Sequence, residues 1–315
     1  MEDGMKVVTH HRARHGLGAG LALALACAAP VAGAQMPVKE VRAQIETAAL
    51  GTEFTLAGVV AARMVLPDQR VLAYVHQPGQ PGIAVVAAAG DAGEIIPRNA
   101  VKLAGKTGTG PFGPALMVSP GTVATTATNQ MFTFAAVSAA LFQDASAMAG
   151  RYVQLANVTF AVPKFDVSGR AEVRAAGGAV VPLRIGHGAL GRETPSGPTD
   201  VFGVVVKAEG RWQLAAARFL PANRKACQEL ATSRTCLTCH TPDVKVVGPA
   251  YRDIAARYRN DADAVSKFIA QMEAGSTGKW GTNVMAPLKA LVPPDDMNTL
   301  ATWVFSYRWD ALLAE

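Results

Sequence analysis

Hydrophobic positions change their spacing late in this chain. From residue 35 to about residue 222, short apolar runs alternate with turns rich in Gly, Pro, Asp and Gln, which is typical of strands joined by tight loops. Two segments of this region, 38–50 and 135–148, have the apolar spacing of short helices. The predicted strands cover residues 54–61, 71–75, 82–88, 152–162, 171–174 and 180–185.

The strand-rich region contains an internal repeat. The run from Gly51 to Val59 aligns with the run from Gly150 to Val158 at an offset of 99 residues. The repeat divides the region into two modules, 35–125 and 126–222, which join through the Ser/Thr/Gly-rich stretch 119–129. Each module holds about five strands in fewer than about 100 residues, which predicts a small closed or partly closed barrel.

Helical spacing dominates the last module, residues 223–315. A helix is predicted over residues 264–274, where apolar side chains recur three and four positions apart. A final helix begins after Pro293, because Pro294 and the two following acidic residues are favoured in a first helical turn. We therefore expect a multidomain chain: two small all-β barrels, each with a short helix, followed by an all-α domain.

Residues 1–34 have the organisation of a signal peptide. Three basic residues precede the apolar run 17–29, and Ala32-Gly33-Ala34 forms a cleavage site before Gln35. We expect the mature chain to start at Gln35 and to be periplasmic. An uncleaved membrane anchor and a lipidated Cys27 stay open as alternatives, and they are the only routes by which we expect membrane association.

The net charge of the chain indicates little about its partners. The 315 residues include 30 basic and 24 acidic side chains, a net charge of +6. Removal of residues 1–34 takes away three basic and two acidic side chains, which leaves a net charge of +5. This charge is too small and too dispersed to indicate a nucleic-acid partner.

Candidate chemistry is concentrated in Cys236-Leu237-Thr238-Cys239-His240, the CxxCH pattern of a covalent haem site. Two thiols at this spacing can add to the two vinyl groups of one porphyrin, and the adjacent His240 can ligate the iron. The pattern also fits a dithiol redox pair or half of a zinc site. A thioredoxin-like pair needs a βαβ setting, which the surrounding sequence lacks. A structural zinc site needs four ligands, and the chain has no second CxxC pair.

One cysteine of the mature chain is left over. Cys227 falls on the same face of a predicted helix as Ala226, Leu230 and Ala231. We therefore interpret it as a small buried hydrophobe, with a reactive thiol as the alternative.

A sixth ligand to the iron must come from residues 223–315, and three methionines are candidates. Met272 and Met297 share helix faces with apolar neighbours, so we expect both in the core. Met285 stands in the Gly- and Pro-bearing segment 275–287, which cannot be a regular helix and can wrap the edge of a haem. We choose Met285 as the axial ligand.

Three other features are interpreted as structural. The GxGxxG pattern over 108–113 precedes a strand and not a helix, so we predict a hairpin turn rather than a dinucleotide site. His76 and His187 have no partner at metal-ligand spacing. We expect each to be solvated or satisfied within the core.

Residues 223–315 resemble small bacterial class I cytochromes c, the single-haem periplasmic electron carriers. The resemblance rests on several motifs in order: the CxxCH pentapeptide, Gly248-Pro249-Ala250-Tyr251, Trp280-Gly281, Met285 before Pro287, and Trp303. It implies one covalent haem c with His240 and Met285 as axial ligands. It also implies that the Pro249 carbonyl holds the imidazole and that Trp280 lines the haem pocket. Ala286 departs from the family, where a proline often follows the ligand.

The modules 35–125 and 126–222 resemble exported bacterial OB-like domains in their strand plan. OB folds often bind oligonucleotides or sugars, and single-strand binding favours exposed aromatic side chains over a basic groove. These modules hold 16 basic against 12 acidic residues, and their aromatic residues mostly sit in strand positions, where core packing is expected. We therefore expect an electron carrier and not an enzyme, with a periplasmic redox protein as partner and no nucleic acid. In this hypothesis the β modules dock or orient the haem domain. The alternatives are a cytochrome subunit of a periplasmic oxidoreductase complex, and a nucleic-acid- or glycan-binding protein with a haem sensor.

Overall fold

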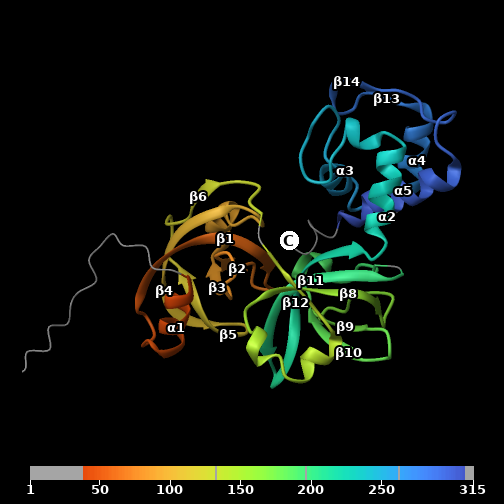
Figure 1. The fold of residues 1–315 in the computed structure, drawn as a ribbon. Helices are drawn as coiled ribbons and strands as arrows, with labels where there is room; N and C mark the ends of the chain where they lie inside the picture. Colours follow the sequence, from red (N-terminus) through yellow and green to blue (C-terminus); the bar gives the residue numbers. More distant parts are fainter. Residues whose placement is uncertain (1–37, 132, 196, 262, 309–315) are drawn as a thin grey trace, which may run out of the picture. The chain divides into compact units, whose positions relative to one another are not determined.

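The computed structural model describes residues 38–131, 133–195, 197–261 and 263–308 (Figure 1). Residues 35–315 form one compact unit by their contacts. The predicted signal peptide, with Cys27, lies outside the described residues. Within the described ranges, no helix has both the length and the apolar character needed to cross a membrane.

The first β region opens with a helix that covers a six-stranded sheet. The strands pair in the order β1-β2-β3-β5-β4-β6, and β1 also pairs with β4, so that five of them close on themselves. All pairs are antiparallel except β3 with β5. The elements are α1 Val38–Thr47, β1 Glu53–Val65, β2 Val71–His76, β3 Ile83–Ala87, β4 Ala100–Gly110, β5 Gly113–Val118 and β6 Ala124–Ala127. The predicted strands and the first helix are confirmed, and β6 lies within the stretch expected to join the modules.

The five closed strands of the second β region have the same pairing plan as those of the first. The strand order of this region is β11-β12-β10-β9-β8-β7 with an added β11–β8 pair, and β10 with β12 is parallel in the same way as β3 with β5. Its main strands are β7 Ala135–Val137, β8 Tyr152–Phe160, β9 Arg170–Arg174, β10 Val180–Arg184, β11 Thr199–Ala208 and β12 Arg211–Pro221. The sixth strand differs, because β6 pairs antiparallel with β4, whereas β7 pairs in parallel with β8, the counterpart of β1.

Two glycines occupy matching positions in the two sheets. A Cβ on Gly105 would lie 2.4 Å from the Met117 carbonyl oxygen, and a Cβ on Gly203 would lie 2.3 Å from the Ala215 carbonyl oxygen. Only a residue without a side chain allows this approach of neighbouring strands. The repeat seen in the sequence therefore extends to a backbone contact in each sheet.

The helix predicted over residues 135–148 is wrong. The segment consists of β7 followed by two short 3₁₀ turns, Ala139–Gln143 and Ser146–Met148. The Asp144 carboxylate accepts a hydrogen bond from the Ser146 backbone N–H at 3.1 Å. This local bond competes with a helical hydrogen bond, so the apolar spacing is satisfied without a continuous helix.

The last region is mainly helical. The predicted helix over 264–274 is confirmed, and the final helix starts at Pro294 as expected. The all-α expectation is corrected by a small hairpin, because Gly275 and Gly281 have φ angles of 79° and 105° that favour a chain reversal. The elements are α2 Arg224–Ser233, α3 Tyr251–Arg257, α4 Ala264–Ala274, β13 Ser276–Gly278, β14 Gly281–Met285 and α5 Pro294–Ser306.

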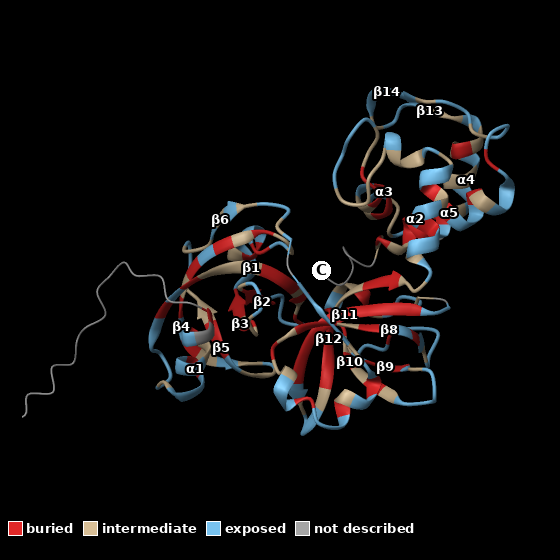
Figure 2. Ribbon diagram, viewed as in Figure 1, coloured by how far each residue is buried: buried red, intermediate tan, exposed pale blue. Residues whose placement is uncertain are grey.

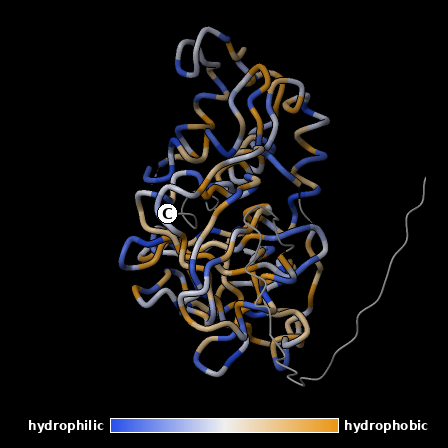
Figure 3. The backbone as a smooth tube through the Cα atoms, turned by 90° about the vertical axis from the view of Figure 1, so that its left-hand side faces the viewer, coloured by the Kyte–Doolittle hydropathy of each residue, from blue (hydrophilic) through white to orange (hydrophobic). Residues whose placement is uncertain are grey.

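Each β region has its own apolar core. Buried residues follow β2 in the first region and β11 and β12 in the second (Figure 2). Hydrophobic and hydrophilic stretches follow one another closely along the chain, as strands with one buried face require (Figure 3). A further cluster of buried side chains joins residues of both β regions to α2, α3 and α5, which bear the last module's core.

Candidate haem-binding site

The CxxCH pentapeptide forms a tight turn after α2. Residues Cys236–Thr238 make one 3₁₀ turn, and the His240 backbone N–H donates to the Cys236 carbonyl at 3.1 Å. The two thiols are unpaired, with Cys236 half-buried and Cys239 exposed. Burial raises the pKa of the Cys236 thiol. The turn therefore holds the two cysteines and His240 on one short segment directly after α2.

The His240 imidazole is held on three sides. Its Nδ1 lies 2.7 Å from the Pro249 carbonyl oxygen, and its ring stacks on Tyr251 with centroids 5.6 Å apart and planes 17° apart. A carbonyl can only accept, so Nδ1 carries the proton and Nε2 keeps a lone pair for a metal. A Cβ on Gly248 would lie 2.3 Å from Cε1 of the ring, so this position must be glycine.

The loop between His240 and Pro249 is stabilised by its own hydrogen bonds. Thr241 Oγ1 donates to the Val244 carbonyl at 2.5 Å and accepts from the Val244 N–H at 3.0 Å. The Gly248 N–H donates to the Cys239 carbonyl at 2.8 Å. The imidazole and the thiols therefore belong to one closed loop.

Met285 ends the hairpin strand β14. It pairs with Ser276 and packs, half-buried, beside the cluster of Met272 and Met297, which are 6% and 1% exposed. The expectation that Met272 and Met297 belong to the core is confirmed. A Cβ on Gly275 would lie 2.6 Å from the Met285 carbonyl oxygen, so the hairpin needs glycine there.

Trp280 lies half-buried at the turn of the same hairpin. The Arg257 guanidinium stands 4.7 Å from the centroid of its ring, and Arg257 Nη1 donates to the Lys279 carbonyl at 2.9 Å. This pair fixes the indole against α3.

Four valines near the pentapeptide and the hairpin are exposed. Val244, Val246, Val247 and Val284 have 48%, 53%, 47% and 69% of their surface accessible. An imidazole whose Nε2 keeps a lone pair and two unpaired thiols on the same short turn fit a covalent haem. No cluster of three or more His, Cys, Asp or Glu side chains that could hold a metal occurs among the described residues.

The GxGxxG pattern, Cys227 and the two other histidines of the mature chain lie outside the candidate haem site. Gly110 pairs with Gly113 across the β4–β5 hairpin, which confirms the turn predicted for the GxGxxG pattern. Cys227 is 3% exposed on α2, as expected of a buried hydrophobe. His187 is exposed, as expected of a solvated histidine. His76 is buried, and its Nε2 has no hydrogen-bond partner within the part of the chain that the structure describes, so the expectation that it is satisfied within the core is wrong for this atom. Burial lowers the pKa of His76 to about 4.

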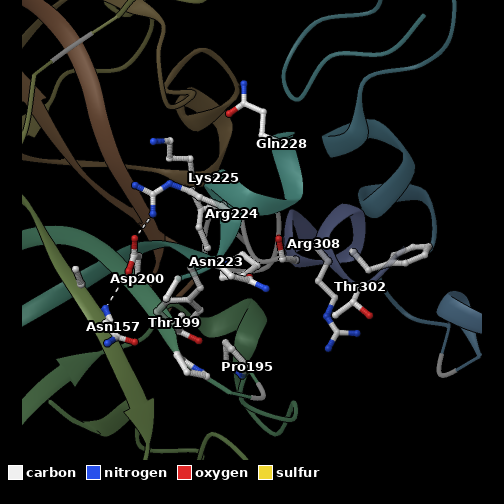
Figure 4. A pocket seen from close by; sticks show the side chains of 18 of the residues that line it. Asn157, Pro195, Thr199, Asp200, Asn223, Arg224, Lys225, Gln228, Thr302 and Arg308 are labelled. Atoms are coloured by element: carbon white, nitrogen blue, oxygen red, sulfur yellow. Dashed lines mark hydrogen bonds and ion pairs between the residues drawn. The ribbon is translucent and has the colours of Figure 1, made fainter. Parts of the chain in front are cut away.

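An open groove of about 1250 Å³ lies elsewhere, along α2 and α5 (Figure 4). Asp200 accepts hydrogen bonds there from the Arg224 guanidinium, from Gln154 Nε2 and from the Asn157 N–H. The buried carboxylate is thus satisfied within the protein. None of the expected haem residues lines this groove.

Three features of the site escaped the sequence analysis. Tyr251 belongs to a quoted motif, but its stacking on His240 depends on how α3 packs. Thr235 has a φ of 59°, which is uncommon for a β-branched residue and carries no sequence signal. Asp243 forms ion pairs with arginines of both β regions, which only the fold brings together.

Known proteins resemble the last module. The family model described as Cytochrome c matches residues 225–307. Cytochrome c-551 of Allochromatium vinosum is 44% identical over 75 residues, 24% of this chain and 79% of that protein. Cytochrome c-552 of Nitrosomonas europaea is 35% identical over 94 residues, 30% of this chain and 90% of that protein.

Solved structures were matched in two parts of the chain. The crystal structure of Nitrosomonas europaea cytochrome c552 shares 38% identity, covering 25% of this chain and 95% of that chain with a TM-score of 0.24. The Ifi202 HINa domain in complex with DNA is 14% identical, with a TM-score of 0.29, and the match covers 53% of this chain and 93% of that chain. These values establish no relationship between the two proteins. The two cytochrome relatives and the family match together show that this chain belongs to the cytochrome c family, whose members carry covalently bound haem c and transfer electrons.

Proposed function

We propose that this protein is an exported monohaem c-type cytochrome, in which His240 and Met285 ligate the iron and the two β modules dock or orient the haem domain. The observation that carries the proposal is the 2.7 Å contact between His240 Nδ1 and the Pro249 carbonyl. A carbonyl on the outer nitrogen fixes the tautomer and makes the inner nitrogen a stronger ligand. A dithiol redox site would not need a histidine whose tautomer is fixed in this way.

Cys236 and Cys239 would hold the haem covalently, and Trp280 would line its pocket. When bound, the haem supplies a one-electron iron couple, whose potential rises with methionine as the second axial ligand. The chain's own contribution is to keep ligands in place. Pro249 and Gly248 position the imidazole, and the β13–β14 hairpin holds Met285, whose side chain is half-buried.

Electron transfer is the function that such a centre supports best. With two protein ligands the iron has no open position for a substrate, so we propose a carrier and not an enzyme. The exposed valines leave an apolar surface for brief contact with a periplasmic redox protein. Co-purification of a dehydrogenase would instead indicate a subunit of an oxidoreductase complex.

The β regions support OB-like barrels at residues 35–125 and 126–222, followed by the haem domain at 223–315. In each region five strands close on themselves, with one parallel pair at the same place in the order. Closure removes exposed sheet edges and makes a rigid support. Residues 1–34 would act as the signal peptide that exports the chain.

A haem-stained denaturing gel tests the covalent attachment. We expect one haem per chain, lost in the double variant Cys236→Ala/Cys239→Ala. The weak absorption band of a sulfur–iron bond should disappear in Met285→Ala and persist in Met272→Leu, a matched change in a core methionine. Absence of stained haem from the wild type would refute the proposal, and persistence of the band in Met285→Ala would refute the ligand.

A further inference from the structure

The loop that follows His240 makes ionic contacts with both β regions. Asp243 Oδ2 lies 2.8 Å from Arg98 Nη1, and its other oxygen lies 3.7 Å from Arg218 Nη2. Arg98 precedes β4, and Arg218 lies on β12. One carboxylate therefore faces one cation from each β region.

The side chains of this triad are partly shielded from water. Arg98, Arg218 and Asp243 have 20%, 25% and 28% of their side-chain surface exposed. Partial burial reduces screening by salt, so such contacts orient their partners more strongly than exposed pairs do.

Each member of the triad is held by its surroundings. The Arg98 backbone has a φ of 72°, and it donates to the Val60 carbonyl at 2.8 Å and accepts from the Gln130 N–H at 2.7 Å. A non-glycine residue in this conformation persists only where neighbours impose it. The Arg218 guanidinium stands 5.4 Å from the centroid of Tyr307.

Asp243 is equally fixed on its own side. It lies within the turn closed by Thr241 and Val244, three residues after His240. The loop continues to Gly248, which meets the imidazole. A displacement of Asp243 would therefore also displace the loop that carries His240, the proposed iron ligand.

We propose that Asp243 is the positioning residue through which both β regions orient the haem domain for electron transfer. This inference rests on the proposed function and extends it, because it assigns the docking role to one carboxylate and two arginines. The β regions then hold the loop of the iron ligand on one flank and leave Val246, Val247 and Val284 exposed for the redox partner.

The test measures the midpoint potential of the full-length holoprotein at low and high salt. Removal of a cation near the haem favours its oxidised form, so Arg98→Gln should lower the potential at low salt although it lies in another module. Asp243→Asn should raise it, and Arg98→Lys should restore the wild-type value. The differences should shrink at high salt, because the Debye length falls from about 30 Å at 0.01 M to about 3 Å at 1 M.

Matched variants remove the same charges elsewhere. Arg70→Gln lies in the same β region in an exposed pair with Asp68, and Asp253→Asn lies on α3. The double variant Arg98→Gln/Asp243→Asn should depart from the sum of its single variants, because the pair is coupled. Equal shifts in Arg98→Gln and Arg70→Gln at low salt would overturn the proposal.

Hydrogen–deuterium exchange provides a readout that does not depend on the iron. Asp243→Asn should cause loss of protection in residues 241–248 and around Arg98, while Asp253→Asn should leave both segments protected. Unchanged exchange at both segments in Asp243→Asn would reject the contact. A haem-stained gel that lacks haem would reject the proposed function alone, so the two failures are distinguishable.

Discussion

The Asn283 side-chain amide donates a hydrogen bond to the Val247 carbonyl at 2.6 Å. This bond joins the strand that bears Met285 to the loop that carries His240, although the two residues are 36 positions apart. The protein itself thus links the segments that carry the two proposed iron ligands.

Asn283→Ala should loosen the Met285 strand without preventing haem attachment. Loss of one partner leaves the Val247 carbonyl without this donor, at an expected cost of about 1 kcal/mol. The absorption band of the sulfur–iron bond should then be lost at a lower temperature than in the wild type. Thr282→Ala, on the same exposed strand, is the control, and an identical melting curve for Asn283→Ala would show that the tether is dispensable.

Gly248→Ala should prevent correct placement of His240. The added methyl group would lie 2.3 Å from the ring and 2.7 Å from Nδ1, which breaks the contact with Pro249. We expect little covalent haem on a stained gel. Gly93→Ala, whose Cβ would meet nothing within 4 Å, should load normally. Normal haem content in Gly248→Ala would contradict the assigned geometry.

Thr235→Gly should stabilise the protein. Thr235 is exposed and has a φ of 59°, a conformation that costs a β-branched residue about 1–2 kcal/mol and costs glycine little. Allowing for the greater freedom of glycine in the unfolded chain, we expect a gain of about 1 kcal/mol in denaturant unfolding. Ser233→Gly, within α2, should instead destabilise, and a loss of stability in both variants would refute the strain.

Stability should fall as the pH falls from 6.5 to about 4, because of His76. Burial, with smaller contributions from Arg42 and Arg151, lowers the pKa of His76 from 6.5 to about 4. The unfolded chain therefore binds a proton that the folded chain refuses, and unfolding becomes easier through this window and no further below it. The loss is on the order of 3 kcal/mol.

His76→Gln should flatten the pH dependence between pH 6.5 and 4, as measured by urea unfolding at fixed pH values. Gly82 leaves little room at this site, since its Cβ would lie 2.2 Å from His76 Nε2, so the variant should also be less stable at neutral pH. The exposed His187→Gln is the control. If the free energy of unfolding of His76→Gln falls with pH as steeply as that of the wild type, other groups cause the acid sensitivity.

Much of the fold followed from local patterns. Strands of alternating burial and helices with an apolar face were predicted where the backbone period matched the apolar period, as in α4. The wrong helix prediction at residues 135–148 also came from reading the apolar spacing alone. A single hydrogen bond from Ser146 to Asp144 outweighed a weak helical pattern, and spacing alone does not reveal such competition.

The sequence by itself determined the chemistry of the site, because the CxxCH pattern sets two thiols and an imidazole within one turn of chain. Only the tertiary structure decided what surrounds that turn. The stacking of Tyr251, the bond from Asn283 to Val247 and the ion pairs of Asp243 join segments far apart along the chain. Their formation depends on how helices and sheets pack, and packing is a property of the whole chain that no local spacing encodes.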